Sequence, residues 1–81
     1  MAQAPLTRIR APELKVLLAR ATGNTTFRDQ LISTPADMLK AEGLRPDQHW
    51  IDFFNDLQAS DFEKRMKLEI NVLDGEAEAG L

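Results

Sequence analysis

The sequence contains no cysteine and no tyrosine, and His49 is its only histidine. Without cysteine, a disulfide framework, a thiolate metal site and a thiol nucleophile are all excluded. With one imidazole and no phenol, most side chains that act as general acids, general bases or metal ligands are missing as well. We therefore expect no catalytic residue, no metal and no cofactor, and a protein that is not an enzyme and works by being bound.

The few remaining polar candidates have simpler explanations. His49 has only aspartates near it in the sequence, whereas a metal site needs three or four converging ligands. The hydroxyls of Thr34 and Ser60 precede predicted helices, where such oxygens cap backbone N–H groups. We expect His49 to be a solvent-exposed side chain and the hydroxyls to be structural.

Long hydrophobic runs are also absent. The longest unbroken one is Val16-Leu17-Leu18-Ala19, far shorter than a membrane span. The first twelve residues lack the apolar stretch of a secretory signal. These observations predict a cytoplasmic protein with no membrane partner.

Positive charge is scarce overall, because the net charge is −3. A general nucleic-acid binder normally has a basic balance, so no nucleic-acid partner is expected. The charge is unevenly spread: residues 1–40 carry six basic and three acidic residues, a net +3, while residues 41–81 carry four and ten, a net −6. Either the two halves present solvated faces of opposite sign, or one end docks onto a partner.

What the chain does contain is a series of helix start and stop signals. Its 81 residues are enough for a single domain. Proline and hydroxyl residues favour helix starts, and glycine favours helix ends. Helices are predicted from Pro12 to Gly23, from Thr25 or Thr26 to Ile32, from Pro35 to Gly43, from Pro46 to Leu57, and from Ser60 onward. The expected fold is all-α, a compact bundle of four to five short helices with flexible termini.

The two ends of the chain lack a clear helical period. We expect residues 1–11 to be a flexible N-terminal arm, residues 12–73 to form the helical domain, and the small, acidic residues 74–81 to be a disordered tail. Within residues 68–73, Leu68, Ile70 and Val72 alternate with polar residues, which is the period of a strand, although a continued helix fits nearly as well.

Aromatic residues are few and clustered. Trp50, Phe53, Phe54 and Leu57 follow the spacing i, i+3, i+4, i+7, which places them on one face of a helix. The simplest interpretation is a core face. If the helices do not cover it completely, Trp50 and Phe53 become anchors for a protein partner.

The middle of the chain carries a recognisable pattern, Phe27-Arg28-x-x-Leu31-Ile32-x-x-Pro35-x-x-x-Leu39-x-x-x-Gly43-Leu44. It resembles the helical leader of nitrile-hydratase-like leader peptides of ribosomally made, post-translationally modified peptides. The aromatic continuation after Gly43 is more similar to the small helical subunit of protocatechuate 4,5-dioxygenase, or to the binding domain of split borosin precursors. The resemblance covers about residues 14–44.

The resemblance implies a leader-like recognition domain that is bound by a modifying enzyme acting on its C-terminal part. In that case Phe27, Arg28, Leu31, Trp50 and Phe53 would contact the partner. Asp74, which precedes Gly75, is the candidate modification site, against the simpler view that the acidic tail only aids solubility. The alternatives are a small non-catalytic subunit of a dioxygenase-type complex and a protein-binding adaptor or inhibitor.

Overall fold

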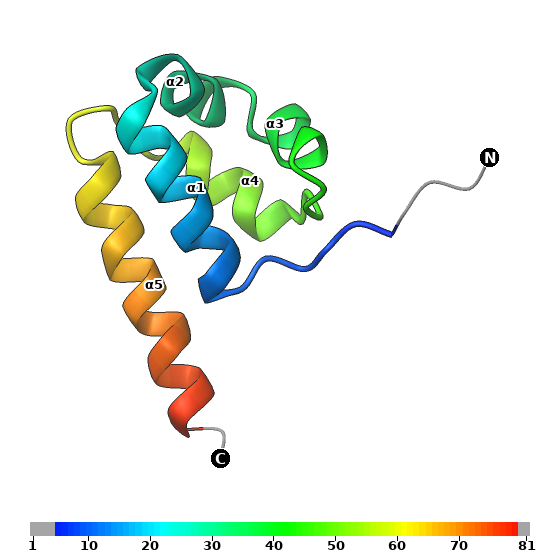
Figure 1. Ribbon diagram of the computed structural model, residues 1–81, viewed down its shortest axis with the longest axis vertical. Helices are drawn as coiled ribbons and strands as arrows, with labels where there is room; N and C mark the ends of the chain where they lie inside the picture. Colours follow the sequence, from blue (N-terminus) through cyan, green and yellow to red (C-terminus); the bar gives the residue numbers. More distant parts are fainter. Residues whose placement is uncertain (1–4, 80–81) are drawn as a thin grey trace.

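The computed structural model describes the backbone of residues 5–79 and the side chains of residues 5–75. Five helices follow one another along the chain: α1 (Ala11–Gly23), α2 (Thr25–Ser33), α3 (Pro35–Ala41), α4 (Gln48–Asn55) and α5 (Phe62–Ala79) (Figure 1). The all-α bundle that the sequence predicts is therefore confirmed. Four of the helices are short, whereas α5 has 18 residues.

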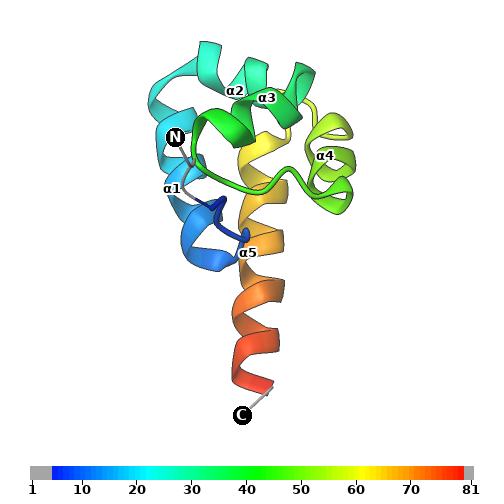
Figure 2. The same cartoon turned by 90° about the vertical axis from the view of Figure 1, so that its right-hand side faces the viewer.

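Helices α1 and α5 lie side by side and run in opposite directions, while α2, α3 and α4 gather around one end of this pair (Figures 1 and 2). All five helices contribute apolar side chains to one core. Its members are Ile9, Ala11, Leu14, Leu17, Ala21, Phe27, Leu31, Leu39, Leu44, Trp50, Phe54, Leu57, Phe62, Met66 and Ile70. No polar or charged side chain of the described residues is buried, so the hydrophobic effect stabilises this core without polar networks.

Helix α3 ends in the glycine stop that the sequence predicts. Gly43 has a φ of +76°, a conformation that glycine adopts without steric cost. Leu44 N–H donates to Leu39 C=O at 2.8 Å, and Gly43 N–H donates to Lys40 C=O at 3.0 Å. This pair of bonds is a Schellman motif, and the buried Leu44 side chain supplies the apolar contact that accompanies it.

The predicted flexible arm differs from the structure over its second half. Thr7 N–H donates to Gly43 C=O, and Arg45 N–H donates to Thr7 C=O, both at 2.8 Å. These bonds form an isolated parallel bridge between Thr7 and Leu44, and Ile9, two residues further along the arm, is only 3% exposed. Residues 7–11 are therefore anchored, because non-local backbone pairing and one buried side chain hold them; residues 1–4 lie outside the described residues.

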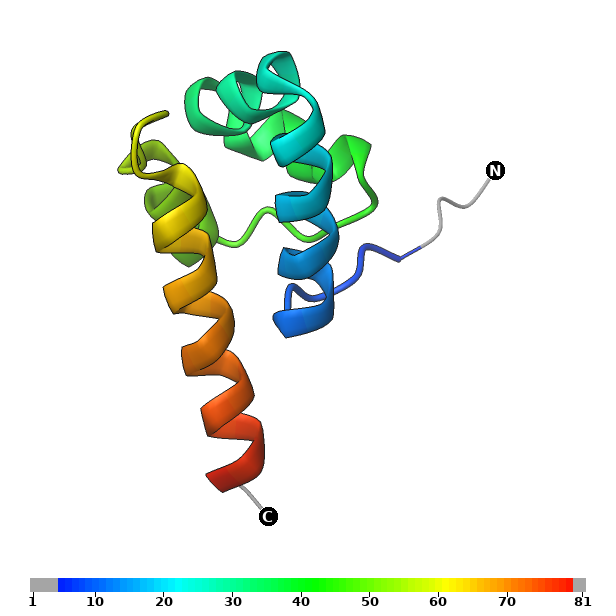
Figure 3. The same ribbon diagram turned by 60° about the vertical axis from the view of Figure 1, so that its left-hand side comes forward.

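The C-terminal segment also differs from expectation. Residues 68–73 are helical, and α5 continues to Ala79, so the predicted disordered tail begins within a helix (Figure 3). Ile70 is buried with Phe62 and Met66, each four residues apart along one face. The strand-like alternation arises because Leu68 and Val72, also four residues apart, form a second, exposed face of the same helix.

Helix capping departs from the sequence-based expectation at three starts. At α2 the cap is Asn24 rather than Thr25 or Thr26, because its side chain accepts a hydrogen bond from Phe27 N–H at 3.1 Å. Thr34 occupies the N-cap position of α3, but its hydroxyl donates backward to Gln30 C=O. The Asp61 carboxylate accepts from Gln58 N–H in the turn before α5. Gly23 lies inside the end of α1, since its φ is not positive.

Candidate functional site

Three of the five predicted partner-binding residues belong to the core. Phe27 is 5% exposed, Leu31 is fully buried and Trp50 is 6% exposed. Side chains at this depth stabilise the bundle and present almost no surface to a partner. The aromatic face of α4 is therefore mainly a core face, as the simplest interpretation of the sequence held.

The other two predicted residues, Arg28 and Phe53, are partly exposed, and both lie close to the segment that joins α4 to α5. The Arg65 guanidinium lies 5.7 Å from the centroid of the Phe53 ring and pairs with Asp56 at 2.9 Å. On its inner side, Phe53 contacts Trp50 edge-on, with 5.6 Å between ring centroids. This arrangement holds Arg65 over an aromatic ring, a geometry that stabilises the cation and is found at protein interfaces.

Arg28 lies on the neighbouring side of the same α4–α5 connection. It lines a small cleft of about 190 Å³ with Thr25, Ser60 and Glu63. Its guanidinium pairs with Asp29 at 3.0 Å. The cleft is polar and shallow, so it suits a hydrogen-bonding contact rather than the enclosure of a ligand.

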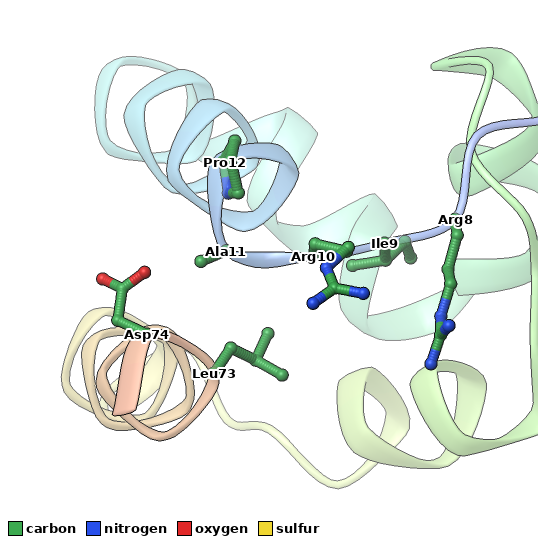
Figure 4. Close-up of a pocket in the computed structure, with 7 residues that line it drawn as sticks. All are labelled: Arg8, Ile9, Arg10, Ala11, Pro12, Leu73 and Asp74. Carbon is green, nitrogen blue, oxygen red and sulfur yellow. The ribbon is translucent and has the colours of Figure 1, made fainter. Parts of the chain in front are cut away.

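A cavity lies between the N-terminal arm and the far part of α5. We call it the arm cleft; it measures about 310 Å³ and is lined by Arg8, Ile9, Arg10, Ala11, Pro12, Leu73 and Asp74. Figure 4 shows the Arg8 and Arg10 side chains leaving the arm on the same side, with Leu73 facing them from α5. Both arginines are exposed, so the cleft combines two solvated cations with an apolar wall.

The candidate modification site, Asp74, lies at the edge of the arm cleft. Its carboxylate pairs with Lys15 of α1 at 3.4 Å, and its side chain is 47% exposed. Asp74 and Gly75 are helical, which directs the following backbone nitrogen along the helix axis and away from the carboxyl carbon. Attack of that nitrogen on an activated Asp74 therefore requires the end of α5 to unwind first.

Exposed apolar side chains form a further feature, which the sequence-based interpretation did not single out. Leu68 is 56% exposed and Val72 is 52% exposed, next to each other on the outer face of α5. Val16 on α1 is 58% exposed and lines a shallow apolar groove with Pro12 and Leu44. The run of apolar residues at 16–18 was a usable signal, because three successive helical positions span too wide an arc to be buried together.

We also searched the described residues for a metal site and for a membrane-spanning helix. His49 is exposed, and no group of three or more His, Asp or Glu side chains lies close enough to hold a metal ion within the described part of the chain. Over residues 5–79, no helix combines the length and apolar character needed to cross a bilayer. Comparisons with known proteins found no matching family model, no matching curated protein and no matching solved structure.

Proposed function

We propose that this chain is a non-catalytic recognition domain, a leader-like precursor whose bundle is bound by a modifying enzyme that acts on its C-terminal part. The observation that supports this proposal is the division of α5. Its first half supplies the buried residues Phe62, Met66 and Ile70, and among the side chains described, up to Gly75, Leu73 is the last that packs against the core. The described core of the bundle therefore draws no side chain from Asp74 or Gly75.

The position of the C-terminal segment suits delivery to an active site. Leu73 and Asp74 lie level with the first residues of α1, and α5 continues beyond that point, away from α2, α3 and α4 (Figure 2). An enzyme that holds the bundle would raise the effective concentration of this segment at its active site. Little binding energy is then required from the segment itself.

The test is the intact mass of the full chain, purified from its native host. We expect a mass above the sequence mass, with the change located in residues 74–81 by peptide mapping. A Phe54→Ala variant, which keeps that segment but loses a fully buried ring, should lose the modification because the bundle is no longer recognised. A Lys64→Gln variant, altered at an exposed position, should keep it. An unmodified wild-type chain would contradict the proposal.

A second function, a small subunit of a dioxygenase-type complex, is favoured by the exposed pair Leu68 and Val72. Two adjacent aliphatic side chains, each more than half exposed on a regular helix, are suited to packing against a larger subunit. In that case the chain would keep its sequence mass and copurify with ring-cleaving activity. Leu68→Ser with Val72→Ser would abolish the copurification.

A further inference from the structure

The arm cleft differs from the rest of the surface in its arginines. Arg20, Arg28, Arg45 and Arg65 each pair with a carboxylate. Arg8 and Arg10 have no such partner among the described residues, although they lie two positions apart and line the same cavity. Two neighbouring guanidiniums that pair with no carboxylate of residues 5–75 can direct their hydrogen-bond donors to an incoming anion.

The wall opposite these arginines carries one apolar side chain, Leu73, beside the Asp74 carboxylate. Leu73 of α5 lies across the opening, and Ile9 and Ala11 form the adjoining surface (Figure 4). A volume of about 310 Å³ is at the small end of ligand pockets, so it fits a few side chains rather than a large cofactor. The occupant must therefore combine carboxylates with a short apolar group.

The local charge favours an acidic occupant. Around the cleft, Arg8, Arg10 and Lys15 are positive, and Glu13 and Asp74 are negative. Asp74 pairs with Lys15 at 3.4 Å, whereas Glu13 accepts a hydrogen bond from the backbone N–H of Arg10 at 2.8 Å, which brings no positive charge. These five side chains therefore sum to a formal charge of +1, and Arg8 and Arg10 are the cations among them that pair with no carboxylate of the described residues.

We infer that the arm cleft binds an acidic segment of a protein partner, with an acidic–apolar–acidic sequence in extended conformation. Successive side chains of an extended segment point to opposite sides. A segment inserted between the arm and α5 would thus direct both carboxylates to Arg8 and Arg10 and its apolar side chain to Leu73 (Figure 4). The inference rests on the proposed function only in taking a protein as the ligand.

The test uses the purified full chain and a capped synthetic tripeptide, Glu-Leu-Glu, at low ionic strength. Amide NMR shifts of the protein report where the peptide binds. We expect shifts at residues 8–12 and 73–74, with Gln-Leu-Gln and inorganic phosphate producing none there. The Arg8→Gln/Arg10→Gln variant should bind about 3- to 20-fold more weakly, because two exposed charge pairs are lost.

The matched control is Lys40→Gln/Lys64→Gln, which removes the same charge at exposed positions outside the cleft and should bind like wild type. Equal binding by the two double variants would overturn the inference, as would equal shifts with Gln-Leu-Gln or phosphate. Shifts at residues 8–12 that depend on protein concentration alone would instead assign the cleft to the acidic C-terminal segment of a second copy. None of these outcomes depends on whether the chain is modified in its host, so the two proposals fail separately.

Discussion

The two ends of the described chain contrast sharply, although they meet at the arm cleft. The N-terminal arm has no repetitive structure, yet Ile9 is 3% exposed and two backbone hydrogen bonds tie Thr7 to residues 43–45. The last turns of α5 are regular helix, yet Val72 is 52% exposed, and within residues 71–75 only Leu73 packs against the core. The irregular segment is anchored, and the regular segment is largely unsupported.

This contrast shows that local regularity and tertiary anchoring are separate properties. A helix satisfies its backbone hydrogen bonds internally, so the end of α5 can form without neighbours. An extended arm has no internal partners, and it is ordered only where another segment supplies them. Four pairs of substitutions or truncations would test how far the contrast extends to stability.

We expect the largest loss of stability from substitutions at the centre of the bundle. Phe54 is fully buried, so Phe54→Ala should lower the free energy of unfolding by about 3–5 kcal/mol. Phe53→Ala, at the half-buried neighbouring position, should cost less than about 2 kcal/mol. Urea unfolding followed by Trp50 fluorescence measures both values. Equal losses for the two variants would show that Phe54 is not buried more deeply than Phe53.

We expect the second-largest loss of stability from a substitution in the N-terminal arm, because Ile9 anchors the arm to the core. Ile9→Ala removes most of a buried side chain and should cost about 2–4 kcal/mol. The nearby Leu6, at 39% exposure, provides the control, and Leu6→Ala should stay within about 0.5 kcal/mol of wild type. If Ile9→Ala is as mild as Leu6→Ala in the same unfolding experiment, the arm behaves as the flexible segment expected from sequence.

Substitutions at Gly43, whose C=O accepts the hydrogen bond from Thr7 N–H, should have an intermediate effect on stability. No atom lies within 4 Å of a Cβ built on Gly43, so a substitution there is penalised through its φ of +76° alone. Gly43→Val should cost about 1–2 kcal/mol because a β-branched residue disfavours this conformation. Gly43→Asn should cost less, since asparagine tolerates it. Thermal unfolding measures both variants, and an equal midpoint for the two would contradict the Schellman motif at Gly43.

Removing the end of α5 should have the smallest effect on stability. A chain ending at Leu73 loses an exposed ion pair and, among the described side chains, no buried one, so its stability should fall by less than about 1 kcal/mol. A chain ending at Glu69 also loses the buried Ile70 and should fall by about 2–4 kcal/mol. Calorimetry of the two truncations measures the difference. A large loss for the first would place the boundary of the domain beyond Leu73.

The features that were predictable from sequence are those determined within a few residues. Helical spacing and stop signals located all five helices, and the helix stop at Gly43 was correct. The core face of α5 follows the same kind of local spacing, because Phe62, Met66 and Ile70 are each four residues apart. Each of these depends on side chains within one or two helical turns.

The features that the sequence did not predict are of two kinds. Some depend on contacts between residues far apart in the chain, and others on how deeply each residue of one helix face is buried. The anchoring of the arm requires residues 43–45, which nothing near Thr7 reveals. Helical spacing favoured a core face for Trp50 and Phe53 and left a partner-binding role open. The packed structure is needed to separate buried Trp50 from half-exposed Phe53. The alternation Arg8-Ile9-Arg10 was the one available sign of the arm cleft, because it is the two-residue period of an extended segment.

The bridge between Thr7 and Leu44 has a consequence for the order of folding. The two residues are separated by 37 positions, so closing that loop costs conformational entropy before any contact is gained. Contacts between neighbouring helices are more local and form earlier on average. The arm therefore docks after the helices have assembled, onto a surface that exists only once α3 has ended at Gly43. In kinetic experiments, Ile9→Ala should accelerate unfolding while leaving the refolding rate nearly unchanged.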